Sequence, residues 1–353
     1  MATIKDVARA AGVSVATVSR VCNGSTLVKE GTRQHVVEVA ARLGYSPHGA
    51  ARSLITSRTS TIGVLLPDLY GEFFSEVIRG IDQTAQHHGY HLLVSSSHDG
   101  RPALEAALRS MRGRVDGLIV MWPEMDADIA VRNLPAGFPV VLLNSPASAD
   151  SFDVIMIANF DGARAMVCHL LDLGHKRIAI IKGAEGNVDA AERLRGYRAA
   201  LAESGVVALP ELEVAGDFNE ESGFRATGEL LLSEARPSAI FAANDAMAVG
   251  SLSALRESGL RVPDDVALAG FDDIPMARYL DPPLSSVHVD ISALGERATV
   301  RLLAAMQEKE NHSYCSETLP TTLVLRRSCG AAVPATRPTA PPIGPFTVTI
   351  PPP

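Results

Sequence analysis

The chain has 353 residues, 46% of them hydrophobic, which is enough to bury more than one core. Its net charge of −8 argues by itself against nucleic-acid binding, but residues 1–60 hold eight Lys and Arg against three acids. That end carries +5 and the remainder −13, the distribution expected of a chain that binds phosphates with one end.

The first sequence motif, from Thr3 to Asn23, predicts two short helices joined by a tight turn. Thr3 and Asp6 have the spacing of a capping box, Gly12 ends the first helix, and Ser14 can cap the second. The second helix would point Val18, Val21 and Cys22 inward. Its outer face would then be Val15, Ala16, Thr17, Ser19 and Arg20, which suits the major groove of DNA. An ordinary helical hairpin would show the same periodicity.

A third helix is expected from about Thr32 to Leu43, where Gly44 follows. Its expected apolar face is Val36, Val37, Val39, Ala40 and Leu43. The segment Lys29-Glu30-Gly31 offers no capping side chain, so we expect a frayed first turn there.

The segment IKDVARAAGVSVATVSRV closely resembles the DNA-binding headpiece of the lac/gal repressor family of bacterial transcription regulators. The similarity continues through GTRQHVVEVAARLGYSP (31–47) and ARSL (51–54) to about residue 328. It implies a helix-turn-helix headpiece over 1–46 and a hinge helix and linker over 47–60. The implied DNA contacts are Thr3, Ser14, Val15, Ala16, Thr17, Arg20, Asn23, Ala51 and Leu54. Leu54 would wedge into the minor groove, although without the resemblance it would simply pack on the body.

From Thr61 onward, apolar strands alternate with amphipathic helices. This pattern predicts two doubly wound lobes, each a parallel sheet covered on both faces. Strands are expected at 61–68, 90–96, 117–122, 139–144, 153–157, 177–181, 212–216, 239–245, 265–273 and 321–327. Helices are expected at 73–88, 104–112, 160–173, 190–204, 220–232, 245–258 and 291–309.

The resemblance identifies residues 61–329 as a periplasmic-binding-protein-like domain for effector binding and dimerisation. It assigns about 61–159 and 289–318 to the first lobe, and about 160–288 and 319–329 to the second. Residues 330–353 are rich in proline and should form a disordered extension. This tail has no leucine heptad, so a homodimer is expected rather than a coiled-coil tetramer.

Polar and aromatic residues follow several strands, and ligands bind at the carboxyl ends of strands in such sheets. Asp68, Trp122, Asn144 and Asn159 are examples. The resemblance assigns effector contacts, in the cleft between the lobes, to Phe73, Phe74, Arg193, Phe218, Asn244 and Asp272. Four of them have an alternative: Arg193 could be solvated, Asp272 could cap a turn, and Phe73 and Phe74 could be core. Asp245 is interpreted as structural, because Asn-Asp is a good start for a helix.

These amides, carboxylates and aromatics suit a polyhydroxylated ring, so the expected effector is a sugar, a sugar acid or a related derivative. The purine-binding branch of the family has Arg and Thr where this chain has Asn187 and Asp189, which makes a purine corepressor the alternative. After the strand that ends near residue 157, the family usually has Asp-Asn, whereas this chain has Ala158-Asn159.

The expected function is a repressor that binds a pseudo-palindromic operator as a homodimer under the control of this effector. An enzyme is not expected, since the chain has no G-x-S-x-G, P-loop, G-x-G-x-x-G turn or H-E-x-x-H motif. His87, His88, His169 and His175 lack partners or ligand spacing and are expected at the surface. A transport solute-binding protein is a weaker alternative, because the head is basic and no export signal is visible.

The sequence also predicts the compartment. Cys22, Cys168, Cys315 and Cys329 show no metal-ligand spacing and are expected to be reduced thiols. No stretch reaches the roughly 20 apolar residues of a membrane span. We therefore expect a cytoplasmic protein with no membrane contact and no cofactor.

Overall fold

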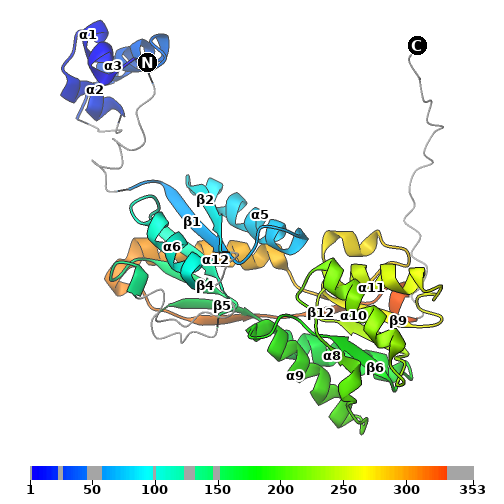
Figure 1. Cartoon of the computed structure of the whole chain (residues 1–353). Coiled ribbons are helices and arrows are strands. Elements are labelled where there is room, and N and C mark those ends of the chain that lie inside the picture. Colours follow the sequence, from blue (N-terminus) through cyan, green and yellow to red (C-terminus); the bar gives the residue numbers. More distant parts are fainter. Residues whose placement is uncertain are drawn as a thin grey trace, which may run out of the picture. The chain divides into compact units, whose positions relative to one another are not determined.

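The computed structural model describes residues 2–22, 27–45, 58–97, 101–122, 132–145 and 152–331. The chain divides into two compact units (Figure 1). The first comprises Met1–Ile157 and Asp290–Leu319, and the second comprises Ala158–Val289 and Pro320–Pro353. The chain therefore crosses between the units three times.

The N-terminal head is a three-helix cluster of α1 (Ile4–Ala11), α2 (Val15–Cys22) and α3 (Glu30–Arg42). The predicted capping box is confirmed, because Asp6 N–H donates to Thr3 Oγ1 and Thr3 N–H donates to Asp6 Oδ2 at 2.9 Å. Ser14 Oγ accepts the Thr17 N–H at 3.1 Å and so caps α2. The three helices enclose a core of small apolar side chains that includes Val7, Val18 and Val36.

Two expectations for α3 are corrected. The helix begins at Glu30, two residues before the expected start, although Lys29 supplies no side-chain cap. Val37 and Leu43 do not belong to the apolar face, since they are 55% and 38% exposed. The helical period turns Val36 and Val39 toward the core, and the residue after Val36 then points to solvent.

The first unit holds a six-stranded parallel sheet in the order β11-β5-β4-β3-β1-β2. The strands are β1 (Thr61–Leu66), β2 (His91–Ser96), β3 (Gly117–Met121), β4 (Val140–Leu143), β5 (Asp153–Ile157) and β11 (Ser316–Leu319). Its helices are α5 (Glu72–His87), α6 (Arg101–Met111) and α12 (Ile291–Glu308). The helix α12 packs on α5 and on β3, β4 and β5, although it lies far from them in the sequence.

The second unit holds a six-stranded sheet in the order β12-β10-β9-β8-β6-β7, parallel except for β12 against β10. The strands are β6 (Ile178–Ile181), β7 (Glu213–Val214), β8 (Ala239–Ala242), β9 (Ala267–Asp272), β10 (Ser285–His288) and β12 (Thr322–Val324). Figure 1 shows α8 (Asn159–Asp172) and α9 (Val188–Glu203) together on one face, and α10 (Glu220–Leu232) with α11 (Asp245–Glu257) on the other. The helices α10 and α11 cross closely at Gly250, where a Cβ would come within 1.8 Å of Glu220 O.

The predicted fold class is confirmed: a helical head is followed by two α/β units built on parallel sheets. Two strands were missed, β10 and β11, because SSVH and SETL do not read as apolar runs. Ser285 and Ser286 are fully buried in β10, and their hydroxyls bond to Arg326 O and Asp245 Oδ1. Such pairing lets polar residues occupy a core strand.

The histidine expectation is partly wrong. His87 and His88 are exposed, but His169 and His175 are half-buried, and Nδ1 of His175 lies 3.1 Å from Ser238 Oγ. All four cysteines are free thiols. Among the described residues, no helix combines the length and apolar character that a membrane crossing needs.

Candidate functional site

The outer face of α2 is open to solvent, as a helix that contacts base edges in DNA requires. Val15 is 42% exposed, and Ala16 and Arg20 are exposed as well. Thr17 is half-buried beside the capping Ser14, and Thr3 is engaged in the cap of α1. Asn23, Ala51 and Leu54 lie outside the described residues. The head thus presents one Arg and small side chains on the face predicted to contact base edges.

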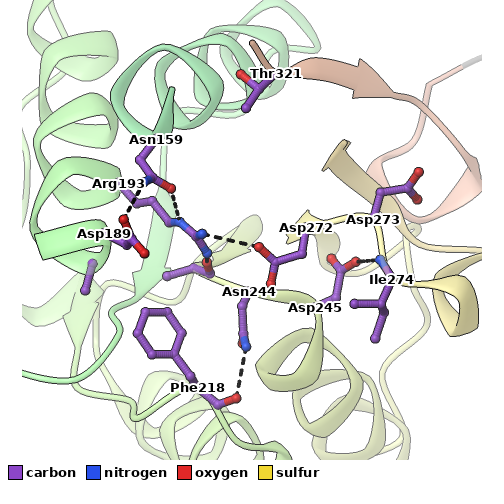
Figure 2. A network of polar contacts seen from close by, with 12 residues as sticks. Asn159, Asp189, Arg193, Phe218, Asn244, Asp245, Asp272, Asp273, Ile274 and Thr321 are labelled. Atoms are coloured by element: carbon purple, nitrogen blue, oxygen red, sulfur yellow. Dashed lines mark hydrogen bonds and ion pairs between the residues drawn. The ribbon is translucent and has the colours of Figure 1, made fainter. Parts of the chain in front are cut away.

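A buried polar network stands at the carboxyl ends of the strands of the second unit. Its centre is Arg193 of α9, which is 3% exposed (Figure 2). Arg193 Nε donates to Asn159 Oδ1 at 2.8 Å and Nη1 donates to Ala243 O at 2.5 Å. Nη2 lies 3.2 Å from Asp272 Oδ1 and completes a buried ion pair. A solvated Arg193 is therefore excluded.

Two aromatic rings flank this guanidinium. Arg193 Cζ lies 3.8 Å from the ring centroid of Phe271 and 5.8 Å from that of Phe218. The Phe218 ring packs against Gly183, where a Cβ would come within 2.1 Å of Phe218 Cζ. Phe218 remains half-buried, with a φ of 71° that is unusual for a residue with a side chain. The ring therefore forms a partly open apolar wall beside the polar network.

The acidic side of the network is strongly desolvated. Asp272 ends β9 with a φ of 104°, and burial raises its pKa to about 6, against the opposing effect of Arg193. Asp189 raises the same pKa further by its negative charge. Asp189 accepts a hydrogen bond from Asn159 Nδ2 at 2.7 Å, so Asn159 links Arg193 to Asp189 (Figure 2). One Arg thus faces two carboxylates.

Asn244 and Asp245 have structural contacts of their own. Asn244 is the N-cap of α11: its Oδ1 accepts the Met247 N–H at 2.9 Å, and its Nδ2 donates to Phe218 O at 2.9 Å. Asp245 is fully buried and accepts from Ser286 Oγ at 2.6 Å and from Ile274 N–H at 2.9 Å. Burial, together with the charge of Asp272, raises the pKa of Asp245 well above its usual value.

Two segments of the chain match models of known protein families. Residues 3–48 match the family model of bacterial regulatory proteins, lacI family, and residues 167–329 match that of a periplasmic binding protein-like domain. The chain is 38% identical over 331 residues to the HTH-type transcriptional repressor PurR of Erwinia tasmaniensis, covering 93% of this chain and 97% of that protein. It is 37% identical to the ribose operon repressor of Haemophilus influenzae, covering 93% and 98%. This chain belongs to the lacI family.

Solved structures of similar proteins agree with this membership. The lac repressor dimer bound to operator and the anti-inducer ONPF matches with a TM-score of 0.84 and 33% identity, covering 94% of this chain and 99% of that one. The transcriptional regulator CelR in its cellobiose complex matches with a TM-score of 0.70 and 31% identity, covering 93% and 100%. As a lacI-family protein, the chain is a transcriptional repressor and not an enzyme.

In this lacI-family chain, the structure brings together four of the six predicted effector residues. Arg193, Phe218, Asn244 and Asp272 lie in one network of the second unit. Phe73 and Phe74 belong to α5 of the first unit, where both are half-buried and their rings meet edge to face at 5.5 Å.

Sequence reasoning passed over two serines of the first unit. Ser97 follows β2 and Ser145 follows β4, and both are buried. Neither hydroxyl has a hydrogen-bond partner in the described part of the chain. Buried hydroxyls normally have one, so both are candidates for contact with a polar ligand. The available signal was a polar residue within two positions of the end of a strand.

Proposed function

We propose that this repressor binds a pseudo-palindromic operator as a homodimer and is controlled by a neutral sugar or sugar derivative. The headpiece would comprise residues 1–46, the hinge and linker 47–60, and the effector domain 61–329. The observation that carries the effector assignment is the buried Arg193–Asp272 pair with Asn159 and Asp189 beside it. The lac repressor structure, a dimer on operator, supports the assembly.

The charge of this network favours a neutral ligand. Arg193 is already engaged by Asp272, Asn159 and a main-chain carbonyl, and Asp189 adds a second carboxylate. An anionic sugar acid would meet two carboxylates and one compensated cation. Hydroxyl groups can donate to carboxylates and accept from the guanidinium, while the Phe218 ring can cover the C–H face of a sugar.

A purine corepressor is the second candidate, because several relatives are named PurR. Other relatives favour the sugar: one is named as a ribose operon repressor, and solved neighbours contain cellobiose or ribose. In this chain Asn187 caps α9, and Asp189 bonds to Asn159. Those positions hold Arg and Thr in the purine-binding branch, so the local chemistry supports the sugar.

Calorimetric titration of the full chain with neutral sugars, the matching sugar acids and purine bases tests the proposal. We expect a neutral sugar to bind, its acid to bind at least about tenfold more weakly, and purines to give no heat. The double variant Asn187→Arg, Asp189→Thr is the matched control, and it should lose sugar affinity. Purine binding by the unaltered chain would overturn the sugar assignment.

A second titration should measure the affinity of the full chain for operator DNA selected from a random pool, with and without the effector. An effector that favours one state of a repressor typically changes operator affinity by about 5- to 150-fold. Selected sites that lack two-fold symmetry would contradict the homodimer on a pseudo-palindrome.

A further inference from the structure

A cavity of about 850 Å³ lies where the strands of the first sheet begin. Its wall comes from the residues just before β1, β2, β3 and β4 and from the turn that follows α12. Representative lining residues are Arg58, Tyr90, Asp116, Phe138, Lys309 and Tyr314. The cavity therefore lies at the amino ends of the parallel strands, whereas Ser97 and Ser145 lie beyond their carboxyl ends. It is separate from the proposed effector contacts.

The floor of the cavity is apolar. Val115 is 4% exposed, and Phe138 and Met306 are half-buried beside it. These side chains come from three separate segments and leave a concave hydrophobic surface. Such a surface favours an aliphatic or aromatic group in a ligand.

Two of the acidic residues that line the cavity are occupied by the fold itself. Asp116 accepts the N–H groups of Thr59 at 2.7 Å and of Ser60 at 2.8 Å, which holds the end of the linker against the residue that precedes β3. Glu308 Oε2 lies 2.8 Å from Nδ1 of His312, whose Nε2 lies 2.6 Å from Asp153 Oδ2. Hence neither Asp116 nor Glu308 is left to bind a cation alone.

Arg58 is a further cation in the wall, and it has an interaction of its own. The remaining charges are one cation and one anion on adjacent residues. In the described part of the chain, the side chains of Lys309 and Glu310 make no hydrogen bond or ion pair. Lys309 has a φ of 51°, and this conformation is held by its N–H donating to Ala305 O and its carbonyl accepting the His312 N–H at 3.1 Å. Because these hydrogen bonds hold the backbone of Lys309 in this strained conformation, the position of its Cβ is fixed.

We propose that this cavity binds an amino-acid-like zwitterion with an apolar side chain. Lys309 would receive the carboxylate, Glu310 the ammonium group, and the floor of Val115, Phe138 and Met306 the side chain. A ligand with a single charge would leave one of the two residues without a counter-charge. Since Asp116 in the same wall holds Thr59 and Ser60, the bound zwitterion would lie against the segment that leads to the DNA-binding head.

The test is calorimetry on the full chain with L-phenylalanine and L-leucine as probes. The matched analogues 2-phenylethylamine and 3-phenylpropionate each lack one charge. We expect the amino acids to bind and each analogue to bind at least about threefold more weakly. The expected difference is modest because ion pairs made by exposed charges contribute little binding free energy. Lys309→Gln should abolish the preference over the amine, and Glu310→Gln the preference over the acid. Both residues are exposed, so these variants should fold.

Two controls separate this site from the effector site. Lys176→Gln changes an exposed lysine of the second unit and should leave amino-acid binding unchanged. Asp272→Asn should also leave it unchanged, while it weakens the sugar. The proposal is overturned if neither amino acid binds at millimolar concentration, if the analogues bind equally well, or if Asp272→Asn removes the binding.

Discussion

Replacing Arg193 with methionine should destabilise the second unit far more than a surface arginine would. The change strips a buried guanidinium from Asn159 Oδ1, Ala243 O and Asp272, none of which is exposed enough to turn to water. Two buried acceptors would lose their donor, at about 1–3 kcal/mol each. The ionised Asp272 would lose its counter-charge as well, and an uncompensated buried charge is costly.

The electrostatic part of this loss is limited by protonation. The pKa of Asp272 is raised to about 6 in the folded chain. At about pH 7, one unit above this pKa, protonating the carboxylate costs a free energy of ~1.4 kcal/mol. With the two acceptors, the total is about 3–7 kcal/mol at neutral pH. An acid whose folded pKa is raised contributes stability below its unfolded pKa and loses it as pH rises through about 6. The difference between variant and parent should therefore shrink by ~1.4 kcal/mol between about pH 7 and pH 5.

Urea denaturation can assign this loss to one unit. The single tryptophan, Trp122, lies in the first unit and is 7% exposed, so its fluorescence reports that unit, whereas circular dichroism reports both. Arg193→Met should shift the dichroism transition more than the fluorescence transition. Arg195→Met is the matched control on the same helix, since Arg195 is 61% exposed and should cost less than about 1 kcal/mol. A loss below about 1 kcal/mol for Arg193→Met, or one independent of pH, would refute the buried network.

Four further predictions concern the effector, the first unit and the head. Asp272→Asn should weaken effector binding about tenfold or more near pH 7.5, and the affinity of the unaltered chain should fall below about pH 6 as Asp272 protonates, both measured by calorimetry. Burial alone would lower the pKa of His312, but its hydrogen bonds to two carboxylates outweigh burial and raise it. The stabilisation is thus present at low pH and lost as pH rises through the folded pKa, so His312→Gln should shift the Trp122 transition more near pH 6 than near pH 9. Exchanging Val15 and Ala16 for polar residues should change which operator half-site is selected, and an unchanged selection would remove this face from recognition. Leu54→Ala should reduce operator bending in a phasing assay while leaving effector affinity intact.

Local patterns were sufficient for the head and for the type of each unit. A capping box, a glycine turn and a second cap within residues 3–17 specify two helices without help from the rest of the chain, and the structure has them. Apolar runs alternating with amphipathic helices likewise indicated parallel sheets. These features depend on residues within a few positions of each other, so spacing alone reveals them.

What the sequence could not determine is which polar residues become buried and with whom. Arg193 has the neighbours of an ordinary surface helix residue, and its burial follows only when Asn159, Ala243 and Asp272 arrive from three other segments. The strand β10 was missed for the same reason, since its serines find partners 41 residues away in the sequence. The strand β11 was missed because it lies at the edge of its sheet, where only Leu319 is buried. Propensity reflects the cost of a polar group without a partner, whereas the tertiary structure supplies the partner and removes that cost.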